Sequence, residues 1–89
     1  MTWQVSVSPD VQYFLSKQDR QVAERLRKGL RKLVCENPFH YVEHLEDKEY
    51  YKYRMGDHRA LIDIDFKNKI LNVQVLDHRT IIYKKYRTN

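Results

Sequence analysis

Basic side chains gather around one short turn of this sequence. Lys52 and Arg54 precede Gly56-Asp57, and Arg59 follows it closely. Like charges that face each other across a hairpin destabilise it. Ammonium and guanidinium groups supply positive charge and hydrogen-bond donors, which suit a phosphate or the extra charge of a pentavalent phosphorane. The crowding of cations therefore predicts a site that holds an anion.

Strands are expected on both sides of this turn. Alternating apolar residues predict three of them, at roughly 50–55, 59–66 and 70–77. A two-residue loop at Gly56-Asp57, the Gly-X type favoured in hairpins, sets Arg54 opposite Arg59. Lys52 then lies opposite Leu61, on the face that points away from the predicted core.

The second hairpin extends this arrangement. If Asn68-Lys69 centres its turn, an apolar face continues across all three strands, through the pairs Phe66–Leu71, Ile64–Val73 and Ile62–Val75. The same register places His78 opposite Arg59. Arg54, Arg59 and His78 are therefore predicted to form one row across three strands. Asp63 or Asp77 offers another way to neutralise Arg59.

The residue types in this row narrow the chemistry. They include no pair of carboxylates, which argues against glycosidase and two-metal hydrolysis. They include no Ser or Cys to act as a nucleophile. An RNA substrate can supply its own nucleophile, the 2′-hydroxyl, and leave the protein to move protons and stabilise charge. Tyr83, close to the row in sequence, is suited to stacking on a base.

Composition sets the wider limits. The chain has 89 residues and a net charge of +5, which predicts one domain over residues 1–89. The charges of residues 1–49 sum to zero, so residues 50–89 carry the whole positive excess.

The single Cys35 excludes an intrachain disulfide and suits a reducing cytosol. No apolar run is long enough to span a membrane, and no signal peptide is apparent. His40 and His44 have metal-compatible spacing but no third ligand nearby, so no metal is predicted.

The N-terminal half supplies the elements that position the strands. Trp3, Val5 and Val7 alternate as in an edge strand, and Ser8-Pro9-Asp10 starts a short helix. Asp19 caps a longer helix that ends at Asn37-Pro38, and residues 39–49 read as an ordered loop. We expect an α+β fold, with an N-terminal strand and a two-helix hairpin packed on a mainly antiparallel sheet that ends in a three-stranded meander.

Two segments resemble the RelE/ParE superfamily of toxin–antitoxin toxins, and the RelE-type mRNA interferases in particular. The stretch from Tyr53 to Arg59 is similar to the strand pair of that family, and Leu76-Asp77-His78-Arg79 with Tyr83 is similar to its closing motif. The resemblance covers nearly the whole chain. It implies a cytoplasmic, ribosome-dependent endoribonuclease that cleaves mRNA in the A site through 2′-hydroxyl attack, without a cofactor.

The same resemblance implies roles for individual residues. The matching catalytic positions are Lys52, Arg54, Arg59, Arg79 and Tyr83. Lys52 would activate the 2′-hydroxyl, Arg54 and Arg59 would stabilise the phosphate charge, and Tyr83 would stack on a base. Arg79 would contact the phosphate or the leaving group. Glu49 and His78 are further acid or base candidates, because some relatives use a Glu and a His. Lys84, Lys85 and Arg87 would contact RNA or the ribosome, or belong to a frayed terminus.

Partners and alternatives follow from the family. The expected partners are a RelB-like antitoxin that covers the basic cleft, the ribosome with its mRNA, and operator DNA only through the antitoxin complex. Two alternatives remain open at this point. A ParE-like protein of the same fold would inhibit DNA gyrase without catalysis, and a nucleic-acid-binding module would bind tightly and with salt sensitivity but release no product.

Overall fold

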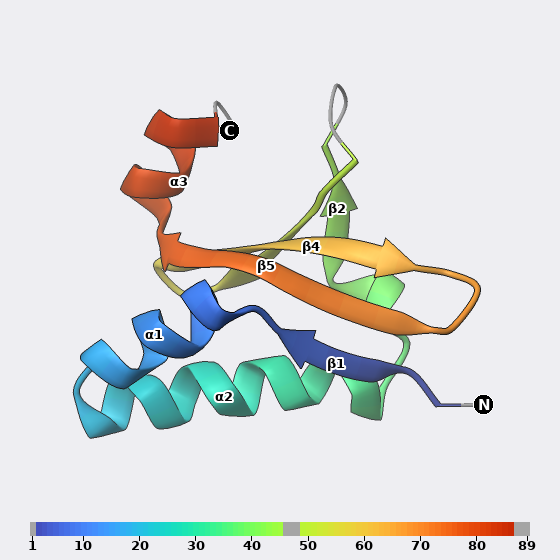
Figure 1. The fold of residues 1–89 in the computed structure, drawn as a ribbon, viewed down its shortest axis with the longest axis horizontal. Helices are drawn as coiled ribbons and strands as arrows, with labels where there is room; N and C mark the ends of the chain where they lie inside the picture. The colour runs from blue at the N-terminus through green and yellow to red at the C-terminus, as the bar shows by residue number, and fades with distance from the viewer. Residues whose placement is uncertain (1, 46–48, 87–89) are drawn as a thin grey trace.

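A mixed five-stranded sheet organises the residues that the structure describes. A computed structural model of the chain describes residues 2–45 and 49–86. The strand order is β1-β5-β4-β3-β2, with β1 parallel to β5 and the other pairs antiparallel (Figure 1). The strands are β1 Gln4–Val7, β2 Val42–His44, β3 Tyr51–Met55, β4 His58–Asp65 and β5 Ile70–His78. The predicted α+β class is confirmed.

Capping side chains start the first two helices as the sequence predicts. The helices are α1 Pro9–Lys17, α2 Arg20–Cys35 and α3 Arg79–Tyr86, with a short 3₁₀ helix at Pro38–His40. The Ser8 hydroxyl accepts a hydrogen bond from the Val11 amide at 3.2 Å and donates one to the Gln74 carbonyl at 2.9 Å. Asp19 accepts from the Val22 amide at 3.0 Å. Among the described residues, no helix is long and apolar enough to cross a membrane.

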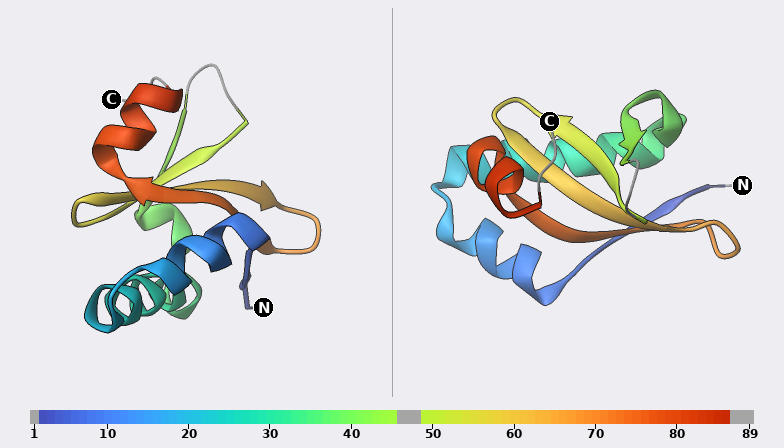
Figure 2. Two further views of the ribbon diagram at one scale, coloured as in Figure 1. Left: turned by 60° about the vertical axis from the view of Figure 1, so that its left-hand side comes forward. Right: turned by 90° about the horizontal axis from the view of Figure 1, so that it is seen from above.

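The helices cover opposite faces of the sheet. α1 and α2 lie on one face, where Leu26, Leu33 and Val73 are fully buried in the main core, and α3 lies on the other face (Figure 2). α3 was not predicted, because its short apolar pair, Ile81-Ile82, gives too little helical periodicity. Ile82 is nevertheless fully buried, and α3 contacts β4 and β5. This third helix provides one wall of the candidate site.

The first hairpin has the predicted register. Met55 pairs with His58, Arg54 with Arg59, and Lys52 with Leu61. Gly56 adopts a φ of +63°, a left-handed conformation that glycine reaches without steric cost.

The predicted register of the second hairpin is wrong. The loop contains four residues, Phe66 to Lys69, because Asp65 pairs with Ile70 and its carboxylate caps the turn at Asn68. This shifts the pairing by two residues, which preserves the apolar face. A β-bulge at Gln74, where Leu61 pairs with Val75 and Ile62 with Val73, then shifts it back by one.

The loop and the bulge together change the predicted row of charges. Arg59 lies opposite Asp77, whereas His78 pairs with His58. The row Arg54–Arg59–His78 is therefore replaced by Arg54–Arg59–Asp77. Asp77, considered from the sequence as one way to neutralise Arg59, is the acid that this register brings opposite it.

The segment predicted as an ordered loop contains further structure. The 3₁₀ helix is followed by β2, which pairs with β3 and sets Glu43 opposite Lys52. Glu46 and Asp47, two acids of the same predicted loop, lie outside the described residues. The prediction missed β2 because three residues are too few to show a period of two.

Candidate active site

A pocket of about 330 Å³ lies on the face of the sheet that carries α3. Strands β2, β3 and β4 and helix α3 each contribute to it. It is lined by Tyr41, Glu43, Lys52, Arg54, Arg59 and Tyr83. Four of the five residues that the family resemblance marks as catalytic therefore line one cavity.

Lys52 is one of the two buried cations that line the pocket. Its side chain is 10% exposed, and its Nζ lies 3.9 Å from a carboxylate oxygen of Glu43. Glu43 itself is largely exposed, so this ion pair has one end in the pocket and one end toward solvent. The cross-strand register between β2 and β3 places the two residues together.

Arg59 is held by the hairpin itself. It is only 4% exposed, and its Nη1 donates to the carbonyl of Gly56 at 2.6 Å and to that of His58 at 2.9 Å. The partial negative charge of these carbonyls offsets part of the repulsion from Arg54 across the strand pair. Arg54, by contrast, is exposed. The hairpin thus combines one fixed guanidinium with one that reaches solvent.

Tyr83 links the two buried cations. Its ring centroid lies 5.8 Å from Lys52 Nζ and 5.8 Å from Arg59 Cζ. Cations at this distance from an aromatic ring are attracted by its negative face. The half-buried ring therefore fixes α3 against the charged centre of the site.

Two lining residues were missed by the sequence analysis. Glu43 and Tyr41 come from the segment read as a loop, and the only sequence signal for Glu43 was its acidic character opposite a basic strand. The Tyr41 hydroxyl donates to Glu36 at 2.7 Å, and this hydrogen bond to a carboxylate raises the pKa of Tyr41. Tyr41 therefore presents its ring, with its hydroxyl already engaged.

Three of the residues predicted for catalysis or acid–base chemistry lie outside the pocket lining. Arg79 begins α3, where its amide donates to the Asp57 carbonyl at 2.7 Å and its side chain lies 3.9 Å from the Asp57 carboxylate. His78 contacts Thr80 through Nδ1 at 3.0 Å. Glu49 is exposed at the start of the chain into β3. Arg79 thus ties α3 to the hairpin turn at the edge of the site.

His58 is a buried histidine beside the site that the sequence analysis did not single out. Its Nδ1 has no hydrogen-bond partner among the described residues, and its ring lies 5.9 Å from the rings of both Phe14 and His78. Burial lowers the pKa of His58, and the nearby His78 and Arg25 lower it further. His58 is therefore a packing residue that prefers to be neutral.

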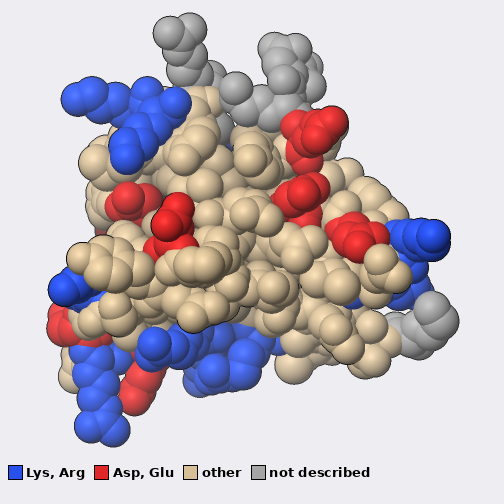
Figure 3. All heavy atoms as spheres, in the orientation of Figure 1, with Lys and Arg blue, Asp and Glu red and all other residues tan. Residues whose placement is uncertain are grey.

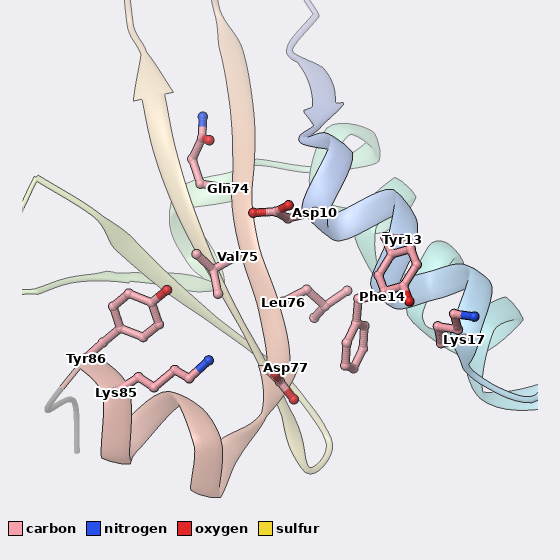
Figure 4. Close-up of a pocket in the computed structure, with 10 residues that line it drawn as sticks. All are labelled: Asp10, Tyr13, Phe14, Lys17, Gln74, Val75, Leu76, Asp77, Lys85 and Tyr86. Carbon is pink, nitrogen blue, oxygen red and sulfur yellow. The ribbon is translucent and has the colours of Figure 1, made fainter.

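Neither of the predicted RNA-contacting lysines of α3 lines the active-site pocket. Lys85 and Tyr86 line a separate hollow of about 400 Å³ between α3, β5 and α1, where they lie across from Phe14 and Asp77 (Figure 4). Lys84 is exposed on α3, and Arg87 lies outside the described residues.

No group of three potential metal ligands is found within residues 2–45 and 49–86. His40 lies in the 3₁₀ helix and His44 ends β2, so their spacing is not that of one helical face.

The pocket combines the groups needed for phosphodiester chemistry without a protein nucleophile. Lys52, Arg54 and Arg59 supply positive charge for a phosphate, and the carboxylate of Glu43 supplies a proton acceptor. The aromatic rings of Tyr41 and Tyr83 form walls against which a base can pack.

Comparison with known proteins gives a consistent result for the fold. No protein-family model and no curated protein matches the sequence. The structure is similar to the RelBE2 toxin–antitoxin complex of Mycobacterium tuberculosis, with a TM-score of 0.77 and 18% identity over 89% of this chain and 100% of that chain. It is also similar to the archaeal RelE–RelB complex of Pyrococcus horikoshii, with a TM-score of 0.71 and 23% identity over 89% of this chain and 97% of that one.

The RelB–RelE antitoxin–toxin complex of Methanococcus jannaschii is a further match, with a TM-score of 0.67 and 14% identity. The alignment covers 90% of this chain and 96% of that one. These matches cover about nine-tenths of this chain, at sequence identities where only architecture is comparable. The chain therefore has the fold of the RelE-type toxins.

Proposed function

We propose that this protein is the toxin of a type II toxin–antitoxin system and that it cleaves mRNA in the ribosomal A site. The likeness to toxins solved with RelB antitoxins supports the toxin assignment. The observation that carries the nuclease assignment is the gathering of Lys52, Arg54, Arg59 and Tyr83, from three separate elements, around one pocket.

The proposed reaction uses the 2′-hydroxyl of the RNA as nucleophile. Its oxygen attacks the adjacent phosphorus while its proton passes to Glu43, the carboxylate that lines the pocket. Arg54 and Arg59 stabilise the charge that develops on the non-bridging oxygens. The bond from phosphorus to the 5′-oxygen breaks, and Lys52 donates a proton to that oxygen. The products are a 2′,3′-cyclic phosphate and a free 5′-hydroxyl.

Lys52 has an alternative role in this scheme. The family resemblance assigns activation of the 2′-hydroxyl to Lys52, whereas the pocket also contains Glu43. The two assignments differ in a measurable way. Replacing Glu43 by Gln abolishes proton transfer if Glu43 is the base, and leaves most of the rate if Lys52 is the base.

The outer residues have supporting roles in this proposal. Tyr83 packs against a base of the A-site codon, and Arg79 contacts the RNA backbone at the rim, where it adjoins the hairpin turn. Lys84, Lys85 and Arg87 are proposed ribosome contacts. The protein acts in the cytoplasm on translating ribosomes, needs no cofactor, and is silenced by a RelB-like antitoxin, whose complex with the toxin binds operator DNA.

The test is cleavage of a defined mRNA on translating ribosomes by the antitoxin-free protein. Wild type is expected to give a cut inside the A-site codon, and Arg54→Ala is expected to lose most of it. The matched control is Lys67→Ala, which removes an exposed cation from the β4–β5 loop, outside the pocket. An intact mRNA after incubation with folded wild type, or equal rates for the two variants, would contradict the proposal. A gyrase supercoiling assay on the same samples tests the ParE-like alternative.

A further inference from the structure

His78 has no role in the proposed reaction, because it lies outside the pocket lining. It is the last residue of β5, and α3 begins at the next residue, Arg79. Its Nδ1 atom accepts a hydrogen bond from the Thr80 amide at 3.3 Å and contacts the Thr80 hydroxyl at 3.0 Å. An N-cap side chain makes this type of bond to the second amide of its helix. The ring of His78 is therefore the N-cap of α3.

This contact determines the protonation state of the ring. A backbone amide can only donate, so the Nδ1 atom that accepts from Thr80 carries no proton. The neutral ring then carries its proton on Nε2. Protonation of Nδ1 would remove the acceptor of the Thr80 amide and leave Nδ1 to donate to the Thr80 hydroxyl. The cap to the amide therefore exists only while His78 is neutral.

α3 is a short helix that depends on its first turn. It has eight residues, of which Ile82 is buried. Helices of this length have little stability of their own in water. The Arg79 amide donates to the Asp57 carbonyl at 2.7 Å, and the Thr80 amide donates to His78. These two bonds satisfy amides that a helix cannot satisfy internally, so losing one of them would loosen the first turn.

Charge acts in the same direction as this hydrogen bond. The N-terminal end of a helix carries partial positive charge. The first turn of α3, residues 79–82, contains Arg79 and no acid, and the last turn contains Lys84 and Lys85. Figure 3 shows basic side chains gathered at the upper left, where Figure 1 places α3. An imidazolium at the start of α3 would therefore be repelled both by the helix end and by Arg79.

The surroundings of His78 contain a second histidine and charges of both signs. The ring of His58, on β4, lies 5.9 Å from that of His78, and the uncharged ring of Phe14, on α1, packs against His58. The charged groups around this pair come from α2, the β3–β4 turn, β5 and α3, and they are Arg25, Asp57, Asp77 and Arg79. Acids and bases are equal in number here, so protonation of either histidine leaves a net positive charge beside the start of α3.

α3 connects this cap to the candidate active site. Tyr83 lies one helical turn after Thr80, and its ring lies 5.8 Å from both Lys52 Nζ and Arg59 Cζ. A change in the first turn of α3 therefore moves a ring that lines the pocket.

We propose that neutral His78 is a positioning residue, which caps α3 and thereby holds Tyr83 over the two buried cations, and that acid releases this cap. His78 transfers no proton to RNA in this role. The effect on cleavage rests on the proposed nuclease function, whereas the cap itself does not.

His78→Asn separates capping from proton transfer, because its amide oxygen accepts hydrogen bonds and does not titrate, and Asn is a favoured N-cap residue. Amide hydrogen exchange of the full chain is measured by NMR at pH 7.5 and 5.5, a range in which histidine titrates, and is corrected for the intrinsic exchange rate. Between these conditions, protection of the Thr80 amide is expected to fall about fivefold more in wild type than in His78→Asn, the factor that a typical N-cap contributes. The control His40→Asn, the same change at an exposed histidine in the 3₁₀ helix, is expected to behave as wild type.

Cleavage of mRNA on translating ribosomes at pH 7.5 measures the effect on the site. His78→Asn is expected to keep at least half of the wild-type rate. His78→Ala, which has no capping atom, is expected to lose about fivefold in rate and to lower Thr80 protection at both pH values.

Four outcomes would overturn the proposal. Equal losses of cleavage in His78→Asn and His78→Ala would identify a proton donor instead of a cap. Full cleavage by His78→Ala would show that the cap does not position Tyr83. Equal falls in Thr80 protection in wild type and His78→Asn would assign the pH dependence to another group, and unchanged protection in His78→Ala would exclude the cap. Absent cleavage by wild type would instead count against the proposed nuclease function, and the exchange measurement would still decide on the cap.

Discussion

The two arginines that face each other across the first hairpin are expected to respond very differently to truncation. Arg54 is exposed, whereas Arg59 is 4% exposed and donates two hydrogen bonds to carbonyls of its own hairpin. Arg54→Ala is therefore expected to reduce mRNA cleavage and leave stability unchanged. Arg59→Ala is expected to reduce both. The contrast distinguishes Arg54, which serves activity alone, from Arg59, which serves both activity and stability.

The magnitudes follow from these contacts. Each charge-assisted hydrogen bond of Arg59 contributes roughly 1.5–3 kcal/mol, and relief of the repulsion with Arg54 returns about 0.2–1 kcal/mol. The Gly56 carbonyl lies at an exposed turn and regains water, which lowers the loss, so the net cost is about 2–4 kcal/mol. For a domain of this size that lowers the melting temperature by roughly 10–25 °C. Arg54→Ala is expected to change the free energy of unfolding by less than about 0.5 kcal/mol.

Urea unfolding followed by circular dichroism measures the stability of both variants, and cleavage on translating ribosomes measures their activity. Activity is compared at a temperature where both are folded, and Arg54→Ala is expected to lose about 100-fold, as expected for removing a stabiliser of an oxyanion. Arg59→Lys serves as a folded substitute if Arg59→Ala does not fold. Two results would refute the reasoning: an Arg59→Ala variant as stable as wild type, or an Arg54→Ala variant as active as wild type.

Three further predictions concern the scaffold of the site. Burial lowers the pKa of His58, so the unfolded chain binds a proton more readily than the folded one. The contribution of neutral His58 to the free energy of unfolding is therefore complete above pH 6.5 and is lost as the pH falls below it. Unfolding free energies at pH 7.5 and 5.5 should show that His58→Leu removes much of this dependence, whereas the exposed His40→Gln does not. Gly29→Ala should change stability by less than about 0.5 kcal/mol in wild type, because better helix propensity is offset by displacement of Met55. In a Met55→Ala background the same substitution should stabilise by about 1 kcal/mol, and equal effects in the two backgrounds, measured as a double-mutant cycle, would exclude this contact. Ser8→Ala should cost about 1–2 kcal/mol in urea unfolding, because Ser8 both caps α1 and holds the bulge carbonyl; a loss within error of zero would contradict this.

Local sequence signals predicted much of the fold because they depend on neighbouring residues. Ser8 and Asp19 cap their helices as expected, since each hydroxyl or carboxylate needs only an amide three residues away. The first hairpin register was predictable from Gly56-Asp57 and the apolar alternation on both sides. Lys52, Arg54, Arg59 and Tyr83 were singled out from residue type and family resemblance, and the structure places them around one pocket.

Long-range packing decided what the sequence analysis could not. The four-residue loop and the bulge at Gln74 together set Asp77, instead of His78, opposite Arg59, and a bulge leaves little trace in an alternating pattern. β2 brings Glu43 beside Lys52, although only three residues form that strand. α3 was missed because its packing depends on one fully buried residue, Ile82, on a helix that contacts β4 and β5.

By itself, the sequence determined the first strand, the first two helices, the three strands of the meander and the cations that crowd the first turn, because caps, turns and strand alternation act over a few residues. The tertiary structure alone decided which acid lies opposite which cation. It also separated the balanced charges of residues 1–49, so that the cations of α2 form a basic face while Glu43 lines the pocket. The physical reason is that pairing across strands and faces depends on register, which a single bulge or a four-residue loop changes without altering the apolar pattern.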